Sequence, residues 1–333
     1  MAAASRVLIG VDIGGTKTAV VAGIADGQGL RVIGRRSFST EPRSRPWRAA
    51  LGTIAGEARS LLAEAAPGSV PAAVGVSCGG PLDSSAGVLL SPPNLPGWHS
   101  VPVVAELQES LGCRAFLQND ANACALAEWR HGAGVGARNM VFLTFGTGMG
   151  AGLILDGRLY EGTNDFGGEV GHIRLADDGP SGYGKDGSFE GFCSGGGIAL
   201  LARAAAARQL AAGRSVAFCA DAGALESITA KDVGDAAEDG DTLARDVLST
   251  SGRWLGRGCA LLIDILNPQL IVIGSIYVRC RRFLQMSMEA EVAREALPGA
   301  ARACAIVPAK LGDGIGDYAC LSVAADGLAK EKP

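Results

Sequence analysis

The residues of this chain best suited to chemistry are glycines and threonines gathered in two turns. One turn, Asp12-Ile-Gly-Gly-Thr-Lys17, lies in the apolar segment 7–21, and the other, Gly146-Thr-Gly-Met-Gly150, lies in the segment 140–155. Glycine lets a turn point several backbone N–H groups at one anion, and short apolar runs on either side are typical of buried strands. Each segment therefore predicts a β-hairpin that faces phosphate, which makes a nucleotide the first ligand to consider.

Neither turn has the sequence of a familiar nucleotide loop. No Gly-Lys-Ser/Thr follows either turn, and the glycine spacing never matches Gly-x-Gly-x-x-Gly. A strand-turn-strand phosphate clamp that occurs twice, with an aspartate in the first copy, predicts two related α/β halves that close on a phosphate chain and its metal. Two ordinary glycine-rich hairpins are the alternative.

Two polar segments farther along the chain could activate or bind a substrate. Asn119-Asp120 falls between an expected strand and an expected helix, so these side chains should project from the carboxyl end of a sheet into a cleft, a good place for a base. Asn and Asp are also preferred helix N-caps, and that interpretation stays open. In Gly168-Glu-Val-Gly-His172, a carboxylate and an imidazole suit vicinal hydroxyls of a sugar ring, although Glu-x-x-His pairs also occur at metal sites and in surface loops.

Composition limits the other possibilities. The chain has 333 residues, enough for about two domains, and 48% of them are hydrophobic. Its formal net charge is -4 without a long basic run, so we expect no nucleic-acid or membrane partner. The nine cysteines form no C-x-x-C pair, and residues 1–6 are too few for the apolar core of a signal peptide. We therefore expect buried free thiols and a cytoplasmic protein.

Apolar periodicity and turn residues predict alternating strands and helices, the pattern of a two-domain α/β fold. The loops expected to carry function are 79–83, 91–98 and the long segment 160–197. Outside the two hairpins, the expected strands are 30–39, 70–78, 113–117, 269–273 and 305–308, and the expected helices are 46–66, 101–111, 121–131, 198–212, 241–266 and 318–329.

Seven short strings occur in order along the chain. They are Asp12-Ile-Gly-Gly-Thr-Lys17, Asn94-Leu-Pro-Gly-Trp98, Asn119-Asp-Ala-Asn122, Gly146-Thr-Gly148, Gly168-Glu-Val-Gly-His172, Glu190 before Ser194-Gly-Gly-Gly197, and Ile271-Val-Ile-Gly274. In this order they resemble the ROK family of sugar kinases, within the wider group of sugar kinases, chaperone ATPases and actin. The resemblance implies a two-domain actin-like ATPase (ribonuclease H-like) α/β fold with an interdomain active-site cleft. Residues 1–118 plus 309–333 would form the smaller domain, and 119–308 the larger.

The resemblance also implies the roles of single residues. Asp120 matches the family's catalytic base, which accepts the proton of the sugar hydroxyl, and Asp12 is the expected Mg²⁺ partner, through water. Lys17 could neutralise phosphate or be a solvated charge, and Trp98 could stack on sugar or pack inside the protein. The residues expected to bind sugar are Gly80, Asn94, Asn119, Asp120, Glu169, His172 and Glu190. Those expected to bind ATP are Asp12, Gly14, Gly15, Thr16, Lys17, Gly146, Thr147, Gly148, Gly196 and Gly274.

One segment departs from the family pattern. Most ROK proteins carry a cysteine-rich zinc loop, C-x-C-G-x-x-G-C, after the histidine, whereas this chain has Ser181, Tyr183 and Ser188 there. Hydroxyls and a phenol are poor ligands for structural zinc, so we expect no zinc site. We expect the loop to be ordered instead by packing of Tyr183, Phe189 and Phe192.

The resemblance thus implies an ATP- and Mg²⁺-dependent hexose kinase, a homodimer, that phosphorylates the primary 6-hydroxyl of glucose or a close analogue. The string 168–172 is more similar to glucose and N-acetylhexosamine kinases than to ROK fructokinases, so an N-acetylglucosamine or N-acetylmannosamine kinase is one alternative. A non-catalytic sugar-sensing ROK protein and a chaperone-like or filament-forming ATPase are two others. We expect no DNA-binding module, because only six residues precede the first hairpin.

Overall fold

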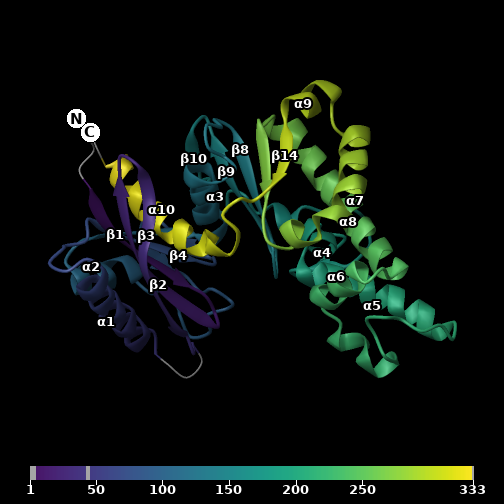
Figure 1. The fold of residues 1–333 in the computed structure, drawn as a ribbon, viewed down its shortest axis with the longest axis horizontal. Coiled ribbons are helices and arrows are strands. Elements are labelled where there is room, and N and C mark those ends of the chain that lie inside the picture. Colours follow the sequence, from purple (N-terminus) through teal and green to yellow (C-terminus); the bar gives the residue numbers. More distant parts are fainter. Residues whose placement is uncertain (1–4, 43–45, 332–333) are drawn as a thin grey trace.

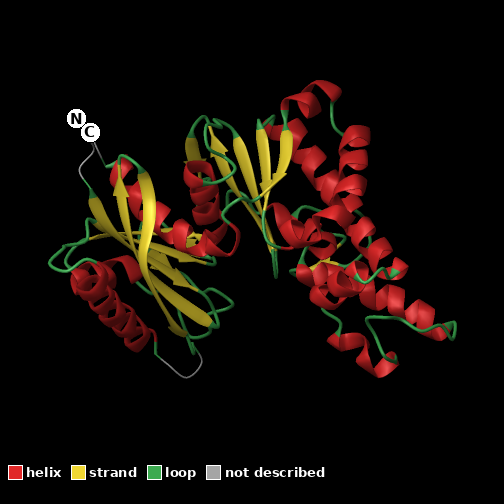
Figure 2. Ribbon diagram, in the orientation of Figure 1, coloured by secondary structure: helices red, strands yellow, loops and turns green. Residues whose placement is uncertain are grey.

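The computed structural model describes residues 5–42 and 46–331. Residues 1–4, 43–45 and 332–333 lie outside it. The N-terminal segment 1–6, considered above as a signal peptide, and both ends of the smaller expected domain therefore include residues that the structure does not describe. Two sheets lie side by side, with helices between them and on their outer faces (Figures 1 and 2). Within the described residues, none of the helices combines the length and the apolar character needed to cross a bilayer.

The two sheets have the same plan. In the first, with strand order β3-β2-β1-β4-β7, three antiparallel strands are followed by two that run parallel to β1. The second, with order β10-β9-β8-β13-β14, repeats this arrangement around β8. This repetition agrees with the two related halves predicted from the two glycine-rich hairpins. The strands are β1 Arg6–Ile13, β2 Lys17–Asp26, β3 Gly29–Ser39, β4 Ala73–Cys78 and β7 Arg114–Asn119, then β8 Met140–Phe145, β9 Met149–Leu155, β10 Arg158–Tyr160, β13 Leu270–Ile273 and β14 Ala305–Pro308.

Helices cover both faces of each sheet. Two helices, α1 and α2, share a buried apolar cluster with the first sheet, and α5, α7 and α8 share another with the second. Short strands β5 and β6 pair as one small hairpin, and β11 and β12 as another. The helices are α1 Trp47–Ala65, α2 Val103–Leu111, α3 Asp120–His131, α4 Phe189–Cys193, α5 Gly195–Ala211, α6 Ala230–Glu238, α7 Thr242–Leu266, α8 Ile276–Glu295, α9 Pro298–Ala303 and α10 Ile315–Lys330, and the short strands are β5 Leu82–Asp83, β6 Val88–Leu89, β11 Ser181–Gly182 and β12 Lys185–Asp186.

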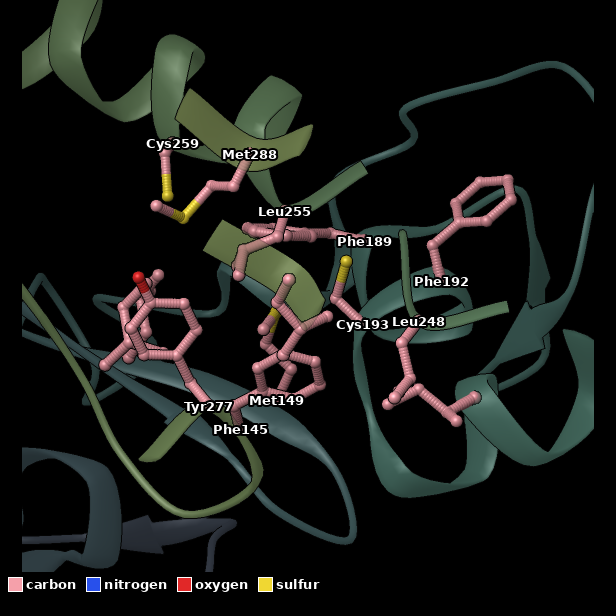
Figure 3. Close-up of a cluster of buried hydrophobic side chains, with 14 of the residues drawn as sticks. Phe145, Met149, Phe189, Phe192, Cys193, Leu248, Leu255, Cys259, Tyr277 and Met288 are labelled. Carbon is pink, nitrogen blue, oxygen red and sulfur yellow. The ribbon is translucent and has the colours of Figure 1, made fainter. Parts of the chain in front are cut away.

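Side chains of strand β8 alternate between two apolar cores, one on each face of the second sheet. Leu143 and Phe145 point to the face covered by α7 and α8, where Figure 3 shows Phe145 near Met149 and Tyr277. Phe142 points to the other face and packs against α3. Because successive side chains of a strand lie on opposite faces, one apolar run fills two separate cores.

Several expected boundaries are wrong. The segment 160–197, expected to be a loop, contains β11, β12, α4 and the start of α5, because local caps order it; the Ser188 hydroxyl, for example, accepts the Gly191 N–H at 3.1 Å. Strand β4 begins at residue 73 rather than 70, since Pro71 has no N–H for a ladder. Helices α6, α8 and α9 were not predicted; α8 buries only five of its 20 residues, so its apolar period is weak. All nine cysteines lie in the described part and are free, as predicted, but only five of them are buried; Cys113, Cys124, Cys280 and Cys304 are partly exposed.

Two helices, α3 and α10, lie back to back between the sheets (Figure 1). Helix α10 packs on β1 and β4, whereas α3 packs on β8 and β9. A Cβ on Gly75 of β4 would overlap the backbone of α10 at Cys320, and one on Gly152 of β9 would overlap Ala125 of α3. These two glycines therefore set how closely each helix approaches its sheet.

The buried carboxylate of Glu128 joins α3 to the segment that leads from β14 into α10. Its Oε1 accepts the N–H groups of Lys310 and Leu311 at 2.9 and 2.8 Å, and its Oε2 accepts the N–H of Ala133 at 2.7 Å. The residue is 0% exposed. Three partly buried backbone donors thus depend on one side chain.

We predict that Glu128→Ala lowers the free energy of unfolding by about 3 kcal/mol, because it removes a fully buried side chain that accepts hydrogen bonds from three partly buried backbone N–H groups. Glu128→Gln should cost less, since an amide oxygen can still accept two of the bonds. Urea denaturation measures both. Glu226→Ala is the control, because the Glu226 side chain is 87% exposed in its ion pair and should matter by less than about 1 kcal/mol. An Ala variant as stable as the Glu226 control would contradict the prediction.

Candidate functional site

Asn119 ends β7 and Asp120 begins α3, so both side chains lie at the predicted strand-to-helix turn. The Asn119 Oδ1 accepts the Ala121 N–H at 2.9 Å, which confirms the N-cap interpretation for this residue. The Asp120 Oδ1 accepts the same N–H at 2.8 Å. The second carboxylate oxygen, Oδ2, lies beside Gly79, as does the side chain of Asn94. One oxygen of Asp120 is therefore fixed by the helix start, and the other lies at the site.

Two adjoining cavities open beside this junction. The first has a volume of about 530 Å³ and is lined by Asp120, the turn 146–150 and Glu169. The second has a volume of about 540 Å³ and is lined by Glu169, His172 and Glu190. The residues that line both are Gly80, Pro93, Asn119, Met149 and Glu169. Together with Asn94, which lines the first cavity, the structure thus brings all seven residues expected to bind sugar into one continuous site.

The expected nucleotide residues of the second half meet around Gly146. Gly146, Thr147 and Gly148 line the first cavity. The Gly146 carbonyl accepts the N–H of Gly195 at 2.7 Å, and Gly195 starts α5 next to Gly196. Ser275, which follows Gly274 at the end of β13, has its hydroxyl 3.6 Å from the position that a Cβ on Gly146 would take. Three segments distant in sequence are thereby joined at one turn.

The turn between β1 and β2 carries the remaining five expected nucleotide residues, Asp12 and Gly14 to Lys17. A Cβ on Gly15 would overlap the backbone of Asn94, so this turn packs against a residue of the first cavity. The turn itself lines neither of the two cavities. The Lys17 carbonyl accepts the Gly14 N–H at 3.0 Å, and its side chain is exposed, so both interpretations of Lys17 stay open.

Burial raises the pKa of three carboxylates of the site, and the charge of Asp120 adds to the rise at Asp12 and Glu169. Burial, followed by the negative charge of Asp120, raises the pKa of Asp12 to about 6, and a hydrogen bond from Ser77 opposes this rise. Burial of the carboxylate raises the pKa of Asp120 as well, and the hydrogen bond from the Ala121 N–H opposes this rise. The Asp120 residue keeps an exposed part at the cavity. The pKa of Glu169 is raised by partial burial, then by Asp120 and Glu190. A site with this much negative charge favours a bound cation.

Glu190 connects the two cavities. Its carboxylate lines the second cavity, and its Oε2 accepts the N–H of Met149 at 2.9 Å in the turn that lines the first. The side chain is held there by α4, whose first turn it occupies. Glu190 therefore orders the glycine-rich turn in addition to facing the expected sugar site.

The segment where the family carries zinc is ordered by hydrogen bonds. The Arg174 guanidinium donates to the Asp186 carbonyl at 2.7 Å, and the Lys185 ammonium donates to the His172 carbonyl at 2.8 Å, which fixes the backbone of His172. Among the described residues, no group of three or more His, Cys, Asp and Glu side chains is placed to hold a metal ion. The contacts of this segment therefore come from its own backbone and basic side chains.

The expected packing of three aromatic rings is confirmed for two of them. Phe189 and Phe192 are buried (Figure 3). Phe192 stacks on Trp254 with ring centroids 3.9 Å apart. The expectation is wrong for Tyr183, whose side chain is 78% exposed. Tyr183 and Gly184 both have positive φ in the turn between β11 and β12, which turns the tyrosine outward, edge-on to His172.

The structure also decides the open question of Trp98 and adds residues that the sequence did not indicate. Trp98 is 1% exposed and belongs to the core under the first sheet, so it does not stack on a ligand. Asp165, Phe166 and Tyr183 line the second cavity. The position of Asp165 and Phe166 directly before the string at 168–172 is the only sequence signal that could have suggested them.

The geometry can be compared with known proteins. A sequence profile described as the ROK family matches residues 8–324. The glucokinase of Thermotoga maritima is 34% identical over 268 residues, which cover 80% of this chain and 81% of that protein. The ROK hexokinase of Thermus thermophilus superposes with a TM-score of 0.78 at 28% identity, covering 97% of this chain and 99% of that one.

A second solved structure is a ROK family glucokinase from Streptomyces griseus in complex with glucose and AMPPNP. Its TM-score is 0.73 at 29% identity, and the match covers 96% of this chain and 100% of that one. The two-sheet architecture described above is thus the actin-like ATPase fold of these kinases, which confirms the predicted fold class.

We predict that the free energy of unfolding depends less on pH in Asp12→Asn than in the wild type. A pKa raised from 3.8 to about 6 means that the folded state holds this proton more tightly than the unfolded chain does. The resulting stabilisation is complete below about pH 4, is lost as the pH rises through about 6, and amounts to about 3 kcal/mol. Urea titrations without metal should show that the free energy of unfolding of the wild type rises relative to that of Asp12→Asn as the pH falls from about 8 to about 4. Parallel curves for the two proteins would argue against the raised pKa, and Asp156→Asn, 70% exposed, is the control.

We predict that the purified protein contains no stoichiometric zinc and that a chelator leaves its Tm unchanged, because Ser181, Tyr183 and Ser188 supply no thiolate. Elemental analysis and thermal unfolding measure this. The triple variant Ser181→Cys, Tyr183→Cys, Ser188→Cys is the matched comparison and should acquire zinc. One zinc per wild-type chain, with a Tm that falls on chelation, would overturn the expectation.

Proposed function

Since this chain belongs to the ROK family, we propose that it is an ATP- and Mg²⁺-dependent hexose kinase that phosphorylates the primary, 6-hydroxyl group of glucose or a close analogue. One observation carries the proposal. The carboxylate of Asp120 lines the same cavity as the glycine-threonine turn 146–150 and the Glu169 carboxylate. A base, a phosphate-facing turn and a polar sugar contact thus share one space. The similarity to a curated glucokinase over 80% of the chain supports the activity class.

The proposed reaction needs positioning more than covalent chemistry. The sugar oxygen attacks the γ-phosphorus, the bond from that phosphorus to the β–γ bridging oxygen breaks, and ADP leaves. The hydroxyl proton passes to Asp120, whose Oδ1 is already held by the Ala121 N–H. The N–H groups of the turn 146–150 would face the phosphate oxygens, while Glu169 and His172 would bind ring hydroxyls. Water is excluded when the two halves close on both substrates.

The residues of the site fit Mg²⁺. Asp12 and Asp120 raise the local negative charge, as the high pKa of Asp12 indicates, and Mg²⁺ is commonly held by one or two carboxylates together with substrate phosphates and several waters. Asp12 would hold the ion through water. When bound, Mg²⁺ supplies neutralisation of the charge on the phosphate oxygens.

The proposal includes the organisation of the chain. We assign residues 1–118 and 309–333 to a smaller domain and 119–308 to a larger one, in line with the packing of α10 on the first sheet and of α3 on the second. A homodimer is supported by exposed apolar side chains on α7 and just before α9, where Ile265 is 71% and Leu297 is 64% exposed. Nine free cysteines suit a cytoplasmic protein.

An N-acetylhexosamine kinase is the second candidate. The second cavity has an apolar wall made by Pro81, Pro93 and Phe166, which could hold the methyl group of an N-acetyl substituent. A non-catalytic sugar sensor is less well supported, because a protein that only binds sugar has no use for both Asp12 and Asp120. A chaperone-like ATPase would have no use for the sugar-facing residues that line the second cavity.

We predict ATP- and Mg²⁺-dependent phosphorylation of one sugar from a panel of glucose, N-acetylglucosamine, N-acetylmannosamine, mannose, allose and fructose. Asp120→Asn should lower kcat by about 10²- to 10⁴-fold, because the base is lost, while sugar binding measured by calorimetry persists. The raised pKa of Asp120 should place the acid limb of the wild-type kcat/KM profile above the ordinary carboxylate range. A coupled assay for ADP follows turnover.

Asp156→Asn is the matched control, since this exposed aspartate lies in a salt bridge outside the site and the variant should keep full activity. Undiminished turnover by Asp120→Asn would remove Asp120 from the role of base. Saturable sugar binding without turnover of any sugar by the wild type would favour the sensor instead.

A further inference from the structure

A single buried amide, that of Gln118, contacts the backbone just before Asp120 and a side chain just after it. Gln118 is 4% exposed at the end of β7. Its Oε1 accepts the Asn119 N–H at 2.8 Å and a hydrogen from the Asn122 side-chain amide at 3.0 Å. Asn122 is itself 1% exposed. The residue before Asp120 and the residue two after it are therefore tied to one oxygen atom.

The nitrogen end of the Gln118 amide is held by the carboxylate of Glu161. Gln118 Nε2 donates to Glu161 Oε1 at 2.7 Å, and Glu161 follows directly on β10. The same carboxylate oxygen accepts from the Lys330 ammonium at 3.2 Å, and Lys330 also pairs with Asp326 at 3.3 Å in α10. A chain of polar contacts thus runs from α10, past the end of β10, to β7, which ends directly before Asp120.

The carboxylate decides which way the amide points. A carboxylate can only accept, so the NH₂ group of Gln118 must face Glu161, and its oxygen must face the two donors, Asn119 and Asn122. In a buried site this choice is enforced, because a reversed amide would leave three groups unpaired. The orientation matters for the site, since Asn119 and Asp120 both hold the Ala121 N–H.

We propose that Gln118 is a positioning residue for the phosphoryl-transfer step, oriented by the Glu161–Lys330 ion pair, and that it fixes the Asp120 carboxylate in the cavity without touching substrate. The inference rests on the proposed kinase function. Neither Gln118 nor Glu161 lines the two cavities of the site; both line a separate cavity of about 310 Å³ behind it, together with Lys330. Their effect should therefore fall on kcat rather than on substrate affinity.

The test exchanges the two partners. Gln118→Glu places two carboxylates against each other, and we expect kcat to fall by about tenfold to a hundredfold while KM for glucose and for ATP stays within about twofold. The double variant Gln118→Glu, Glu161→Gln restores a donor facing an acceptor and leaves an oxygen for Asn119 and Asn122, so most of kcat should return. Glu161→Gln alone should cost little, because its amide can turn to present oxygen.

Two results would overturn the proposal. One is a folded Gln118→Glu with wild-type kcat, and the other is a folded double variant that is no faster than the single one. If Gln118→Glu fails to fold, Glu161→Ala is used instead, and it should lower kcat with unchanged KM while the exposed control Asp156→Asn does not.

Hydrogen exchange of the segment 119–122, measured without sugar or ATP, separates failure of the inference from failure of the proposed function. Faster exchange in Gln118→Glu that the double variant reverses supports the positioning contact even if no sugar is phosphorylated by the wild type. Equal exchange in all three proteins would show that Gln118 does not hold this segment.

Discussion

The close packing of α3 and α10 between the two sheets is the constraint on which the rest of the structure depends. Each helix lies so near its sheet that Gly75 and Gly152 have no room for a Cβ. The buried carboxylate of Glu128 then holds the returning chain at residues 310–311 against α3. Because both connections between the sheets pass through this layer, the position of Asp120 relative to the first sheet is set by backbone contacts rather than by flexible side chains.

That geometry creates the electrostatics of the site. Asp12 lies at the end of β1 and Asp120 at the start of α3, and the helix layer brings these two segments together. Burial raises the pKa of both carboxylates, and the charge of Asp120 raises the pKa of Asp12 further. Like charges held together in a partly buried site repel one another, and a bound cation would relieve this repulsion. Glu169, which lines both cavities, responds to the same negative charge.

The loop without cysteines is ordered by contacts within the protein chain. A tight turn with two residues of positive φ, an ammonium from Lys185 and two buried phenylalanines hold it. The hydrogen bond from Lys185 fixes the backbone of His172 while leaving its ring exposed. The backbone path of this loop is therefore stabilised by contacts that need no thiolate.

The sequence by itself determined what depends on local chemistry. The two hairpins follow from apolar runs around glycine turns, and the Asn119 cap follows from its place before α3. Apart from Gly80, the residues expected to bind sugar came from the seven family strings, and all seven of them line the two cavities. Only the tertiary structure decided what depends on burial by distant segments, such as the core position of Trp98 and the contact of Gln118 with Glu161. Such contacts join residues more than 40 positions apart, and no local period or turn signal encodes them.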